Sequence, residues 1–306
     1  MMENIYTIGM DCGATHTKVA VWREDKIVFE EDNWPGLNMD LISGVFSVEV
    51  LRDEIEKIRE YENADWVIAM AGLDDSNEVN KALSWWRKNL EELGIMYKDL
   101  DVMGDIDLVL WSGSPEGIGV ALIAGTGSNC LAKDTDGRLV KVGGMSHVMS
   151  DEGSGYALGS RCLHIITKMS DGRLPVTAML KQTLDWYVQE DVVALKHFLV
   201  SSSALKYEVA RCAGILLSAA KNGDEEAVNA ANDEAGELVK MVETANNTLA
   251  LEKPLNLFMA GSLLKNDYYL KLIEEKLAIS FPEQKIEIVR PILGVLNFRQ
   301  WRIMNT

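Results

Sequence analysis

A run of short strands around a glycine-containing turn occurs twice in this chain, and this repeat limits the possible folds more than any other feature. Apolar segments at 5–11, 18–22 and 27–30 recur about 114 residues later at 119–124, 130–133 and 138–142. The first strand of each copy leads into a turn, over 12–17 and 125–129 respectively. A repeat of this length predicts two similar α/β domains facing each other. A ligand is expected in the cleft between them.

The segments outside the repeat alternate between helix and strand. The expected helices cover 48–61, 76–93, 267–277 and 291–303, and most of 155–251 with a break at 222–224; the further strands cover 66–71, 255–260 and 286–289. Ser76 is a suitable N-cap for the second helix. We expect an N-terminal domain over 1–112, with 291–306 packing back on it, and a C-terminal domain over 113–290.

Composition excludes several classes of partner. The formal net charge of −17 opposes binding to nucleic acid or an anionic membrane, because both need a basic surface. No apolar run approaches the ~20 residues of a membrane span, and the N-terminus lacks a secretory signal. The four cysteines include no CxxC pair, so reduced thiols in a cytoplasmic protein are expected.

The two glycine turns are candidate phosphate sites. DCGATHT and AGTGSN each follow a buried strand, and small residues there let consecutive backbone N–H groups approach a phosphate oxygen. Either turn alone is more often an ordinary hairpin turn. Their recurrence at equivalent places favours two opposed turns that hold one polyphosphate.

Three aspartates end apolar stretches: Asp11, Asp105 and Asp151. A carboxylate at a strand end can hold Mg²⁺ or accept a proton from a hydroxyl. An ordinary helix cap is the alternative, especially for Asp105, which precedes a helical segment. Asp107 competes with Asp105 for any catalytic role.

The loop GGMSHVMSDEGSGYALG, residues 143–159, is dense in small residues. Such density is entropically costly unless close packing or a ligand requires it, and we expect a loop against a substrate. His147 in this loop is more simply structural than catalytic. The turn at Gly261 and Ser262 in FMAGSLLKND suits a nucleotide base or sugar, and a plain βα loop is an equal alternative.

In this order, these segments resemble the sugar kinases of the actin-like ATPase superfamily, and most closely the N-acetylglucosamine kinase and BadF/BadG ATPase family. The resemblance covers nearly the whole chain. DCGATHTK is similar to the first phosphate motif, VMGDIDLVL to the segment with the catalytic aspartate, IAGTGSNCLA to the second phosphate motif, and FMAGSLLKN to the adenosine motif. It implies two actin-like, ribonuclease H-like domains, an interdomain ATP and sugar cleft, and a homodimer.

The resemblance also implies a role for each matching position. Asp105 would be the catalytic base, and Asp11 would hold Mg²⁺ through water. The sugar would contact Asn38, Gly72, Asp105, Asn129 and Asp151. ATP would contact Asp11, Gly13, Ala14, Thr15, Thr17, Lys18, Gly125, Thr126, Gly127, Gly214, Gly261 and Ser262.

The sequence departs from the family pattern at a few positions. Cys12 and Ala14 replace glycines in the first phosphate motif. The 143–159 loop is similar to the family's sugar-binding loop, but Met145, Ser146 and Ser150 stand where N-acetylglucosamine kinases usually have tryptophan and glycine. The substrate is therefore open among N-acetylglucosamine, glucose as in broad-specificity archaeal hexokinases, and the sugar acid 2-keto-3-deoxygluconate. A sugar acid would need a cation, for which Arg161 and Lys133 are candidates.

Two other classes of function stay open: an ATPase that activates a partner enzyme, and a silent sugar-binding regulator. One family branch activates 2-hydroxyacyl-CoA dehydratases with an iron–sulfur cluster at a dimer interface. The four separated cysteines argue against that branch. Because Cys12 and Cys130 belong to opposed turns, ATP is expected to shield at least one of them from alkylation.

Overall fold

The computed structural model divides the chain into two compact units. One comprises Met1–Ala121 with Val289–Thr306, and the other Leu122–Ile288. Each is described here by itself. The structure describes residues 6–13, 15–37, 49–61, 63–73, 75–251 and 254–305.

The first unit contains a mixed five-stranded sheet in the order β3-β2-β1-β4-β5. Its strands are β1 (Tyr6–Cys12), β2 (His16–Arg23), β3 (Lys26–Pro35), β4 (Ala64–Met70) and β5 (Tyr97–Gly104). The first three form an antiparallel meander, and β4 and β5 run parallel to β1. The expected meander is present, with β2 and β3 longer than their apolar segments.

Three helices connect these strands: α2 (Glu49–Glu56), α3 (Ser76–Glu92) and α4 (Asp105–Gly113). The helix expected over 48–61 ends early, because Lys57 and Ile58 donate to carbonyls three residues back rather than four. The N-cap of α3 is Asp75, not Ser76 as expected. Its carboxylate accepts from Asn77 N at 2.7 Å and Glu78 N at 2.9 Å.

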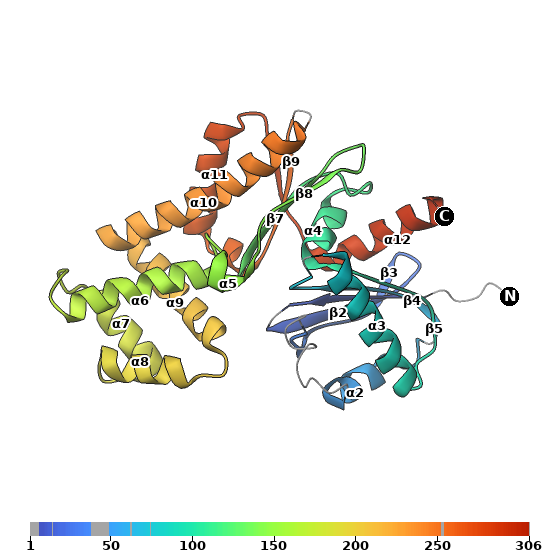
Figure 1. Ribbon diagram of the computed structural model, residues 1–306, viewed down its shortest axis with the longest axis horizontal. Helices are drawn as coiled ribbons and strands as arrows, with labels where there is room; N and C mark the ends of the chain where they lie inside the picture. Colours follow the sequence, from blue (N-terminus) through green and yellow to red (C-terminus); the bar gives the residue numbers. More distant parts are fainter. Residues whose placement is uncertain are drawn as a thin grey trace. The chain divides into compact units, whose positions relative to one another are not determined.

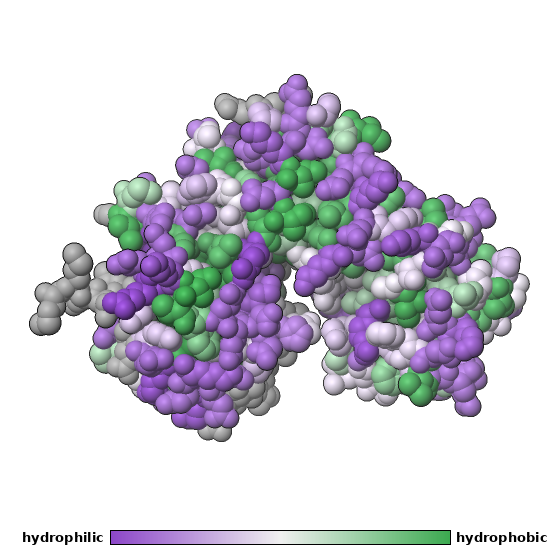
Figure 2. Space-filling view, turned by 180° about the vertical axis from the view of Figure 1, so that it is seen from behind, coloured by the Kyte–Doolittle hydropathy of each residue, from purple (hydrophilic) through white to green (hydrophobic). Residues whose placement is uncertain are grey.

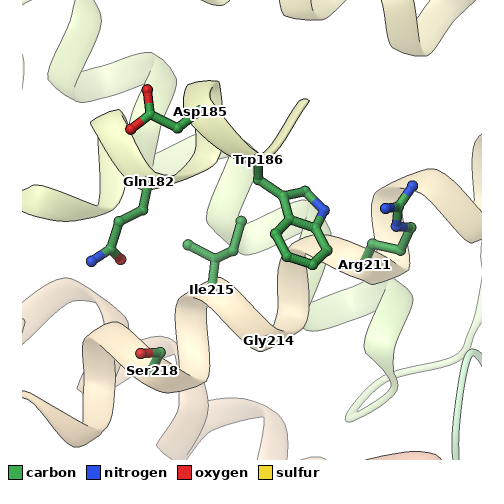
Figure 3. Close-up of a pocket in the computed structure, with 7 residues that line it drawn as sticks. All are labelled: Gln182, Asp185, Trp186, Arg211, Gly214, Ile215 and Ser218. Atoms are coloured by element: carbon green, nitrogen blue, oxygen red, sulfur yellow. The ribbon is translucent and has the colours of Figure 1, made fainter. Parts of the chain in front are cut away.

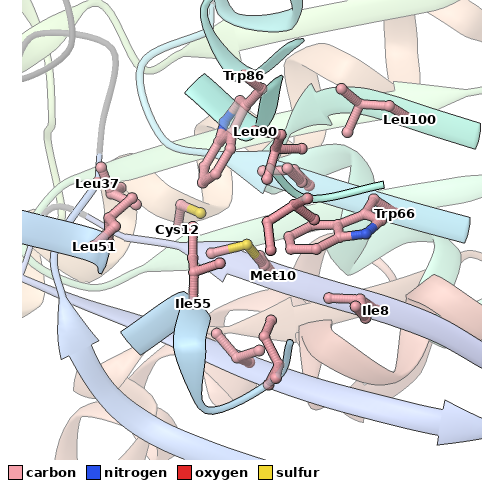
Figure 4. Packing of buried hydrophobic residues seen from close by; sticks show 14 of the residues in the cluster. Ile8, Met10, Cys12, Leu37, Leu51, Ile55, Trp66, Trp86, Leu90 and Leu100 are labelled. Atoms are coloured by element: carbon pink, nitrogen blue, oxygen red, sulfur yellow. The ribbon is translucent and has the colours of Figure 1, made fainter. Parts of the chain in front are cut away.

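Both faces of this sheet are buried. Ile8 and Met10 face one apolar cluster with residues of α2 and α3 (Figure 4). Trp22 faces a second cluster that includes Val295 of the C-terminal helix. Gly9 lies between Ile8 and Met10 in the strand and faces the second cluster. A Cβ at Gly9 would come within 2.6 Å of Val295 Cγ2. Successive residues of β1 point to opposite faces of the sheet, and helices cover both of these faces.

The C-terminal helix packs on α4. The chain passes through the short helix η2 (Pro291–Leu293) into α12 (Gly294–Asn305), which lies beside α4 (Figure 1). Asn297 Nδ2 donates to Trp111 O at 2.8 Å, and Arg299 pairs with Asp65 at 2.8 Å. These contacts join the last helix to the first unit.

The second unit has the same strand order. Its sheet, β10-β9-β6-β7-β8, matches the first sheet strand for strand when β6 takes the place of β1. The strands are β6 (Gly119–Ala124), β7 (Ser128–Lys133), β8 (Leu139–Gly143), β9 (Asn256–Ala260) and β10 (Lys285–Ile288). The repeat in the sequence is thus a repeat of topology.

A large helical insertion separates β8 from β9. Its members are α5 (Ser146–Met149), α6 (Gly155–Ser170), α7 (Ala178–Tyr187), α8 (Val192–Ser201), α9 (Leu205–Lys221) and α10 (Glu225–Leu249). After β9 come η1 (Ser262–Lys265) and α11 (Asp267–Ser280). The expected break at 222–224 lies between α9 and α10, where Asp224 caps α10 through Ala227 N at 3.1 Å. No helix among the described residues is both long and apolar enough to cross a bilayer.

Candidate functional site

The first unit brings two of the predicted aspartates to one edge of its sheet. Cys12, Met70 and Gly104 occupy one row across the three parallel strands β1, β4 and β5. Asp11 stands one position before this row, and Asp105 one position after it. Because parallel strands end at the same edge, both carboxylates lie at the carboxyl edge, where α/β sheets bind ligands.

Gly72 lies at the same edge, just after β4. Its φ of +80° is a conformation that favours glycine. The next residue, Leu73, places its carbonyl oxygen 3.6 Å from where a Cβ of Gly104 would be. The structure therefore brings Gly72 next to the start of α4 and within the same strand-end region as the aspartates.

Asp11 is a largely buried carboxylate, with a side chain only 14% exposed. Burial raises its pKa, and the Lys18 ammonium, 3.5 Å from Asp11 Oδ2, partly opposes this rise. A divalent cation would relieve the same desolvation. Mg²⁺ commonly takes one or two protein carboxylates and completes its shell with phosphate and water oxygens. A single desolvated carboxylate such as Asp11 suits this mode. Among the described residues, no group of three or more histidine, cysteine, aspartate or glutamate side chains is placed to hold a metal ion.

Asp105 is the first residue of α4 rather than its cap, since the N-cap is Gly104. Asp105 Oδ1 accepts from Ile106 N at 2.8 Å. Asp107 folds back toward the start of the helix, where its Oδ2 lies 2.9 Å from the Cβ position of Gly104. Both carboxylates are half-buried, and their negative charge suits the first turn of a helix.

The first glycine turn is partly closed by its own hydrogen bonds. Gly13 N donates to His16 O at 3.0 Å, and Gly13 O accepts from Leu37 N at 3.0 Å. Thr15 is half-buried, Thr17 is fully buried and Lys18 is exposed. The Gly13 amide is therefore engaged in the turn itself. Two other predicted residues, Ala14 and Asn38, lie outside the described residues.

The second glycine turn rests on the start of α6. Gly125 N donates to Gly127 O at 2.9 Å across the turn. The carbonyls of Gly125 and Thr126 accept from Gly155 N at 2.8 Å and Tyr156 N at 3.1 Å. With its carbonyls directed at α6, this turn is fixed in place by a helix start.

Asp151 does not end a strand, contrary to expectation. The short helix α5 follows β8, and Asp151 lies in the loop from α5 to α6 with a φ of +71°. Its carboxylate, 4% exposed, accepts from Ser128 N at 3.2 Å and lies 2.8 Å from Lys206 Nζ. Lys206 was missed because it lies far along the chain on α9, in no recognisable motif.

Asn129 offers a polar atom for a ligand. Its Oδ1 is buried and has no hydrogen-bond partner within the described part of the chain. A Cβ at Gly144, beside it, would lie 2.7 Å from this oxygen, so glycine is required there. A buried acceptor without a donor is costly. A ligand hydroxyl could supply the donor.

Close packing explains several small residues of the 143–159 loop. A Cβ at Gly153 would lie 2.3 Å from Leu238 Cγ on α10, and one at Gly159 would lie 1.9 Å from Val209 O on α9. Close packing alone therefore explains these two glycines, without a ligand. His147 packs its ring against Tyr156, with centroids 4.8 Å apart, as a structural histidine would.

The turn after β9 lies against the second glycine turn. Gly261 has a φ of +124°, and a Cβ there would lie 2.1 Å from Ala124 O at the end of β6. Ser262 opens η1, and its Oγ is 3.9 Å from the Cβ position of Gly125. Gly261 and Ser262 are thus brought together with Gly125.

Gly214 lies on the exposed face of α9. It lines a pocket of about 570 Å³ between α7 and α9 (Figure 3). Arg211 lies over the Trp186 ring there, 5.4 Å from its centroid.

The two cysteines expected in the glycine turns lie instead in strands, Cys12 at the end of β1 and Cys130 in β7, and their thiols are inaccessible. Cys12 and Cys130 are both 0% exposed. Burial raises the pKa of Cys12, and it raises the pKa of Cys130 to about 12. Since the thiolate is the reactive form, alkylation is slow with or without ATP. The expected shielding by ATP therefore has no reactive thiol on which to act.

The sequence profile of the BadF/BadG/BcrA/BcrD ATPase family matches residues 8–295. The chain belongs to this family. Membership in the BadF/BadG family confirms the resemblance inferred from the motifs, and an ATPase family implies the use of ATP.

Similar proteins span nearly the whole of this BadF/BadG-family chain. An N-acetylmuramic acid/N-acetylglucosamine kinase of Clostridium acetobutylicum is 27% identical, over 92% of this chain and 93% of its own. An N-acetyl-D-glucosamine kinase of Dictyostelium discoideum is 25% identical, over 94% of each. The crystal structure of a proposed N-acetylglucosamine kinase from Chromobacterium violaceum has a TM-score of 0.74 at 18% identity, covering 95% of this chain and 98% of that one. The expected fold class is confirmed.

Proposed function

We propose that this protein is an ATP-dependent kinase that transfers the γ-phosphoryl group of ATP to a hydroxyl of an amino sugar of the N-acetylglucosamine class. The observation that carries the proposal is the similarity to two N-acetylhexosamine kinases over more than nine-tenths of the chain. The strand-end carboxylates of the first unit and the glycine turns of both units support it. Phosphoryl transfer mainly requires positioning and charge neutralisation, which such groups supply.

The proposed roles follow from these positions. Asp105 accepts the proton of the attacking hydroxyl, as a carboxylate at a strand end can do. Asn129 uses its unpartnered Oδ1 to accept a hydrogen bond from a sugar hydroxyl. Backbone groups near Gly125 and Ser262 hold the nucleotide, with their positions fixed by the close contacts of the second unit.

Asp11 is the residue that would hold Mg²⁺. When bound, the cation would neutralise phosphate charge on the nucleotide. Once Asp11 ionises, its single negative charge is balanced by the Lys18 ammonium 3.5 Å away, so this pair supplies no net positive charge for a phosphate. The net charge of −17 makes such local neutralisation necessary for an anionic substrate.

An ATPase that activates a partner enzyme is the rival from another class. The iron–sulfur branch of that class needs accessible thiolates. All four cysteines, Cys12, Cys130, Cys162 and Cys212, are buried in this structure. This burial favours the kinase over that form of activator.

A coupled assay for ADP, with mass detection of sugar phosphates, tests the proposal. The panel would contain N-acetylglucosamine, N-acetylmuramic acid, glucose and 2-keto-3-deoxygluconate with Mg²⁺ and ATP. We expect phosphorylation of an N-acetylated amino sugar, and a fall in kcat of about 10²–10⁴-fold in Asp105→Asn with nucleotide binding retained. Asp107→Asn is the matched control. ATP hydrolysis without any phosphorylated sugar would reject the kinase, and loss of kcat only in Asp107→Asn would move the base.

A further inference from the structure

The carboxylate of Asp151 connects three separate elements of the second unit. It accepts from Ser128 N, at the start of β7. It pairs with Lys206 Nζ at 2.8 Å, in the first turn of α9. Its own backbone belongs to the loop that leads into α6. The Asp151 carboxylate therefore joins the end of the glycine turn and α9 to the loop that leads into α6.

The glycine turn is shaped around this carboxylate. A Cβ at Gly127 would lie 2.9 Å from Asp151 Oδ1, so only glycine allows the close approach. The neighbouring Ser128 side chain also joins the loop, since its Oγ donates to Glu152 O at 2.7 Å. Asp151 holds this position although its φ of +71° is unfavourable for an aspartate. The turn and the aspartate thus fix one another.

Lys206 supplies the charge that this arrangement needs. The Asp151 side chain is only 4% exposed, whereas Lys206 keeps 32% of its side chain in contact with solvent. A buried carboxylate without its cation is strongly unfavourable, and this cost is relieved by protonation of the carboxylate or by a shift of the surrounding backbone, each of which disturbs the contact with Ser128 N. The backbone in question is the one that positions the amides of the second glycine turn.

We propose that Lys206 is a positioning residue for nucleotide binding: by pairing with Asp151 it holds the turn of Gly125 to Gly127 in the geometry that receives the phosphates of ATP. The inference rests on the proposed function in that ATP is taken as the ligand of this turn. It gives Asp151 a different role from the sugar contact implied by resemblance. The loss of Lys206 should accordingly affect the nucleotide and not the sugar.

Three variants test the inference. Lys206→Met removes the charge and keeps most of the length, and Lys206→Arg keeps the charge. Lys240→Met is the matched control, because Lys240 pairs with Glu237 on the exposed side of α10. Titration calorimetry with a non-hydrolysable ATP analogue and Mg²⁺ measures Kd, steady-state kinetics separate KM from kcat, and circular dichroism checks the fold.

We expect Kd for the analogue and KM for ATP to rise at least about tenfold in Lys206→Met, with kcat and the KM for sugar within about twofold of wild type. Lys206→Arg should restore Kd to within about threefold, and Lys240→Met should match wild type. If Lys206→Met does not fold, Lys206→Gln, which keeps one donor for Asp151, is expected to show the same split with a smaller rise.

Some results would overturn the inference. A folded variant without a cation at position 206 that binds the analogue as wild type does would remove the positioning role. A rise confined to the KM for sugar would return Asp151 to the sugar site. The proposed function fails separately: if no sugar is phosphorylated but the Kd pattern holds, the inference stands without the kinase. Absence of analogue binding by the wild-type protein would reject both.

Discussion

At the scale of the single residue, Asp11 shows the cost of burying a carboxylate. The fold buries this carboxylate and offers it one ammonium at 3.5 Å, from a lysine that is itself 48% exposed. Burial therefore raises the pKa of Asp11 above its ordinary value of 3.8 despite Lys18. Folding would be easier with a neutral side chain here. The Mg²⁺ role proposed for Asp11 agrees with this cost, because groups kept for function often lower stability.

The raised pKa of Asp11 predicts how stability depends on pH. The folded protein retains the Asp11 proton at pH values where the unfolded chain has lost it, so this group's contribution to stability falls as pH rises from about 3.8 through the raised pKa. Asp11→Asn should remove that fall. At pH 7 the variant should melt higher, by about 2–4 °C for each kcal/mol recovered, and should lose activity.

Thermal melts of wild type and Asp11→Asn between pH 4 and pH 8 measure this difference. Asp171→Asn is the control of opposite sign, because Arg173 lowers the pKa of Asp171 and its charged form is the favoured one. This control should not melt higher at pH 7. A melting temperature for Asp11→Asn below that of wild type at pH 7 would contradict the burial argument.

At the scale of the element, short-range patterns located most strands and long helices. Apolar segments such as β4, buried along its whole length, are recognisable because strand burial and hydrophobicity coincide. β5 was not predicted, since Lys98, Asp99 and Asp101 interrupt its pattern and Arg302 of α12 pairs with both aspartates. The partner that makes those charges acceptable comes from the far end of the chain. Local sequence cannot show it.

The same reasoning separates the predicted site residues from the missed one. Asp11 was found because the end of β1 can be read from the sequence, whereas Asp105 was found from the short apolar stretch before it and the family resemblance; parallel pairing brings both to one edge. Lys206 and its contact with Asp151 depend on how α9 packs against α6, which no motif records. The role of Gly159 was misjudged for the same reason: its need is set by Val209 on another helix.

Two helical glycines test this packing between α6 and α9. A Cβ at Gly159 would lie 1.9 Å from Val209 O. A Cβ at Gly236 on α10 would meet no neighbouring atom of the described residues within 4 Å. Gly159→Ala should therefore destabilise the protein by about 2 kcal/mol or more, because backbone must move. Gly236→Ala should stabilise it by about 0.5–1 kcal/mol through helix propensity. Urea unfolding measures both, and a stable Gly159→Ala would contradict the close helix contact.

At the scale of the whole molecule, the two units place different residues at equivalent strand ends. The shared strand order makes the end of β1, with Asp11, equivalent to the end of β6, with Gly125. It makes Gly72, after β4, equivalent to Gly261, after β9. Both units thus carry glycines after equivalent strands, and the first unit adds the carboxylates of Asp11 and Asp105. A phosphotransferase needs both kinds of group, and the repeat supplies them on one scaffold.

The overall charge of the molecule opposes its anionic substrate. Hydrophilic side chains cover much of the face shown in Figure 2, and the net charge is −17. MgATP carries negative charge as well, so long-range repulsion should slow its approach at low salt. Added salt shortens the screening length from about 30 Å at 0.01 M to about 8 Å at 0.15 M. Short-range contacts within the site are screened much less.

We therefore expect kcat/KM for MgATP to rise at least about twofold between 0.01 M and 0.15 M KCl. An uncharged sugar feels no such repulsion, so kcat/KM for the sugar at saturating MgATP should stay constant and serves as the internal control. Steady-state assays at fixed free Mg²⁺ measure both quantities. If kcat/KM for MgATP instead falls as salt rises, the potential of the local cations outweighs the net charge, and steering toward the site is attractive despite an acidic surface.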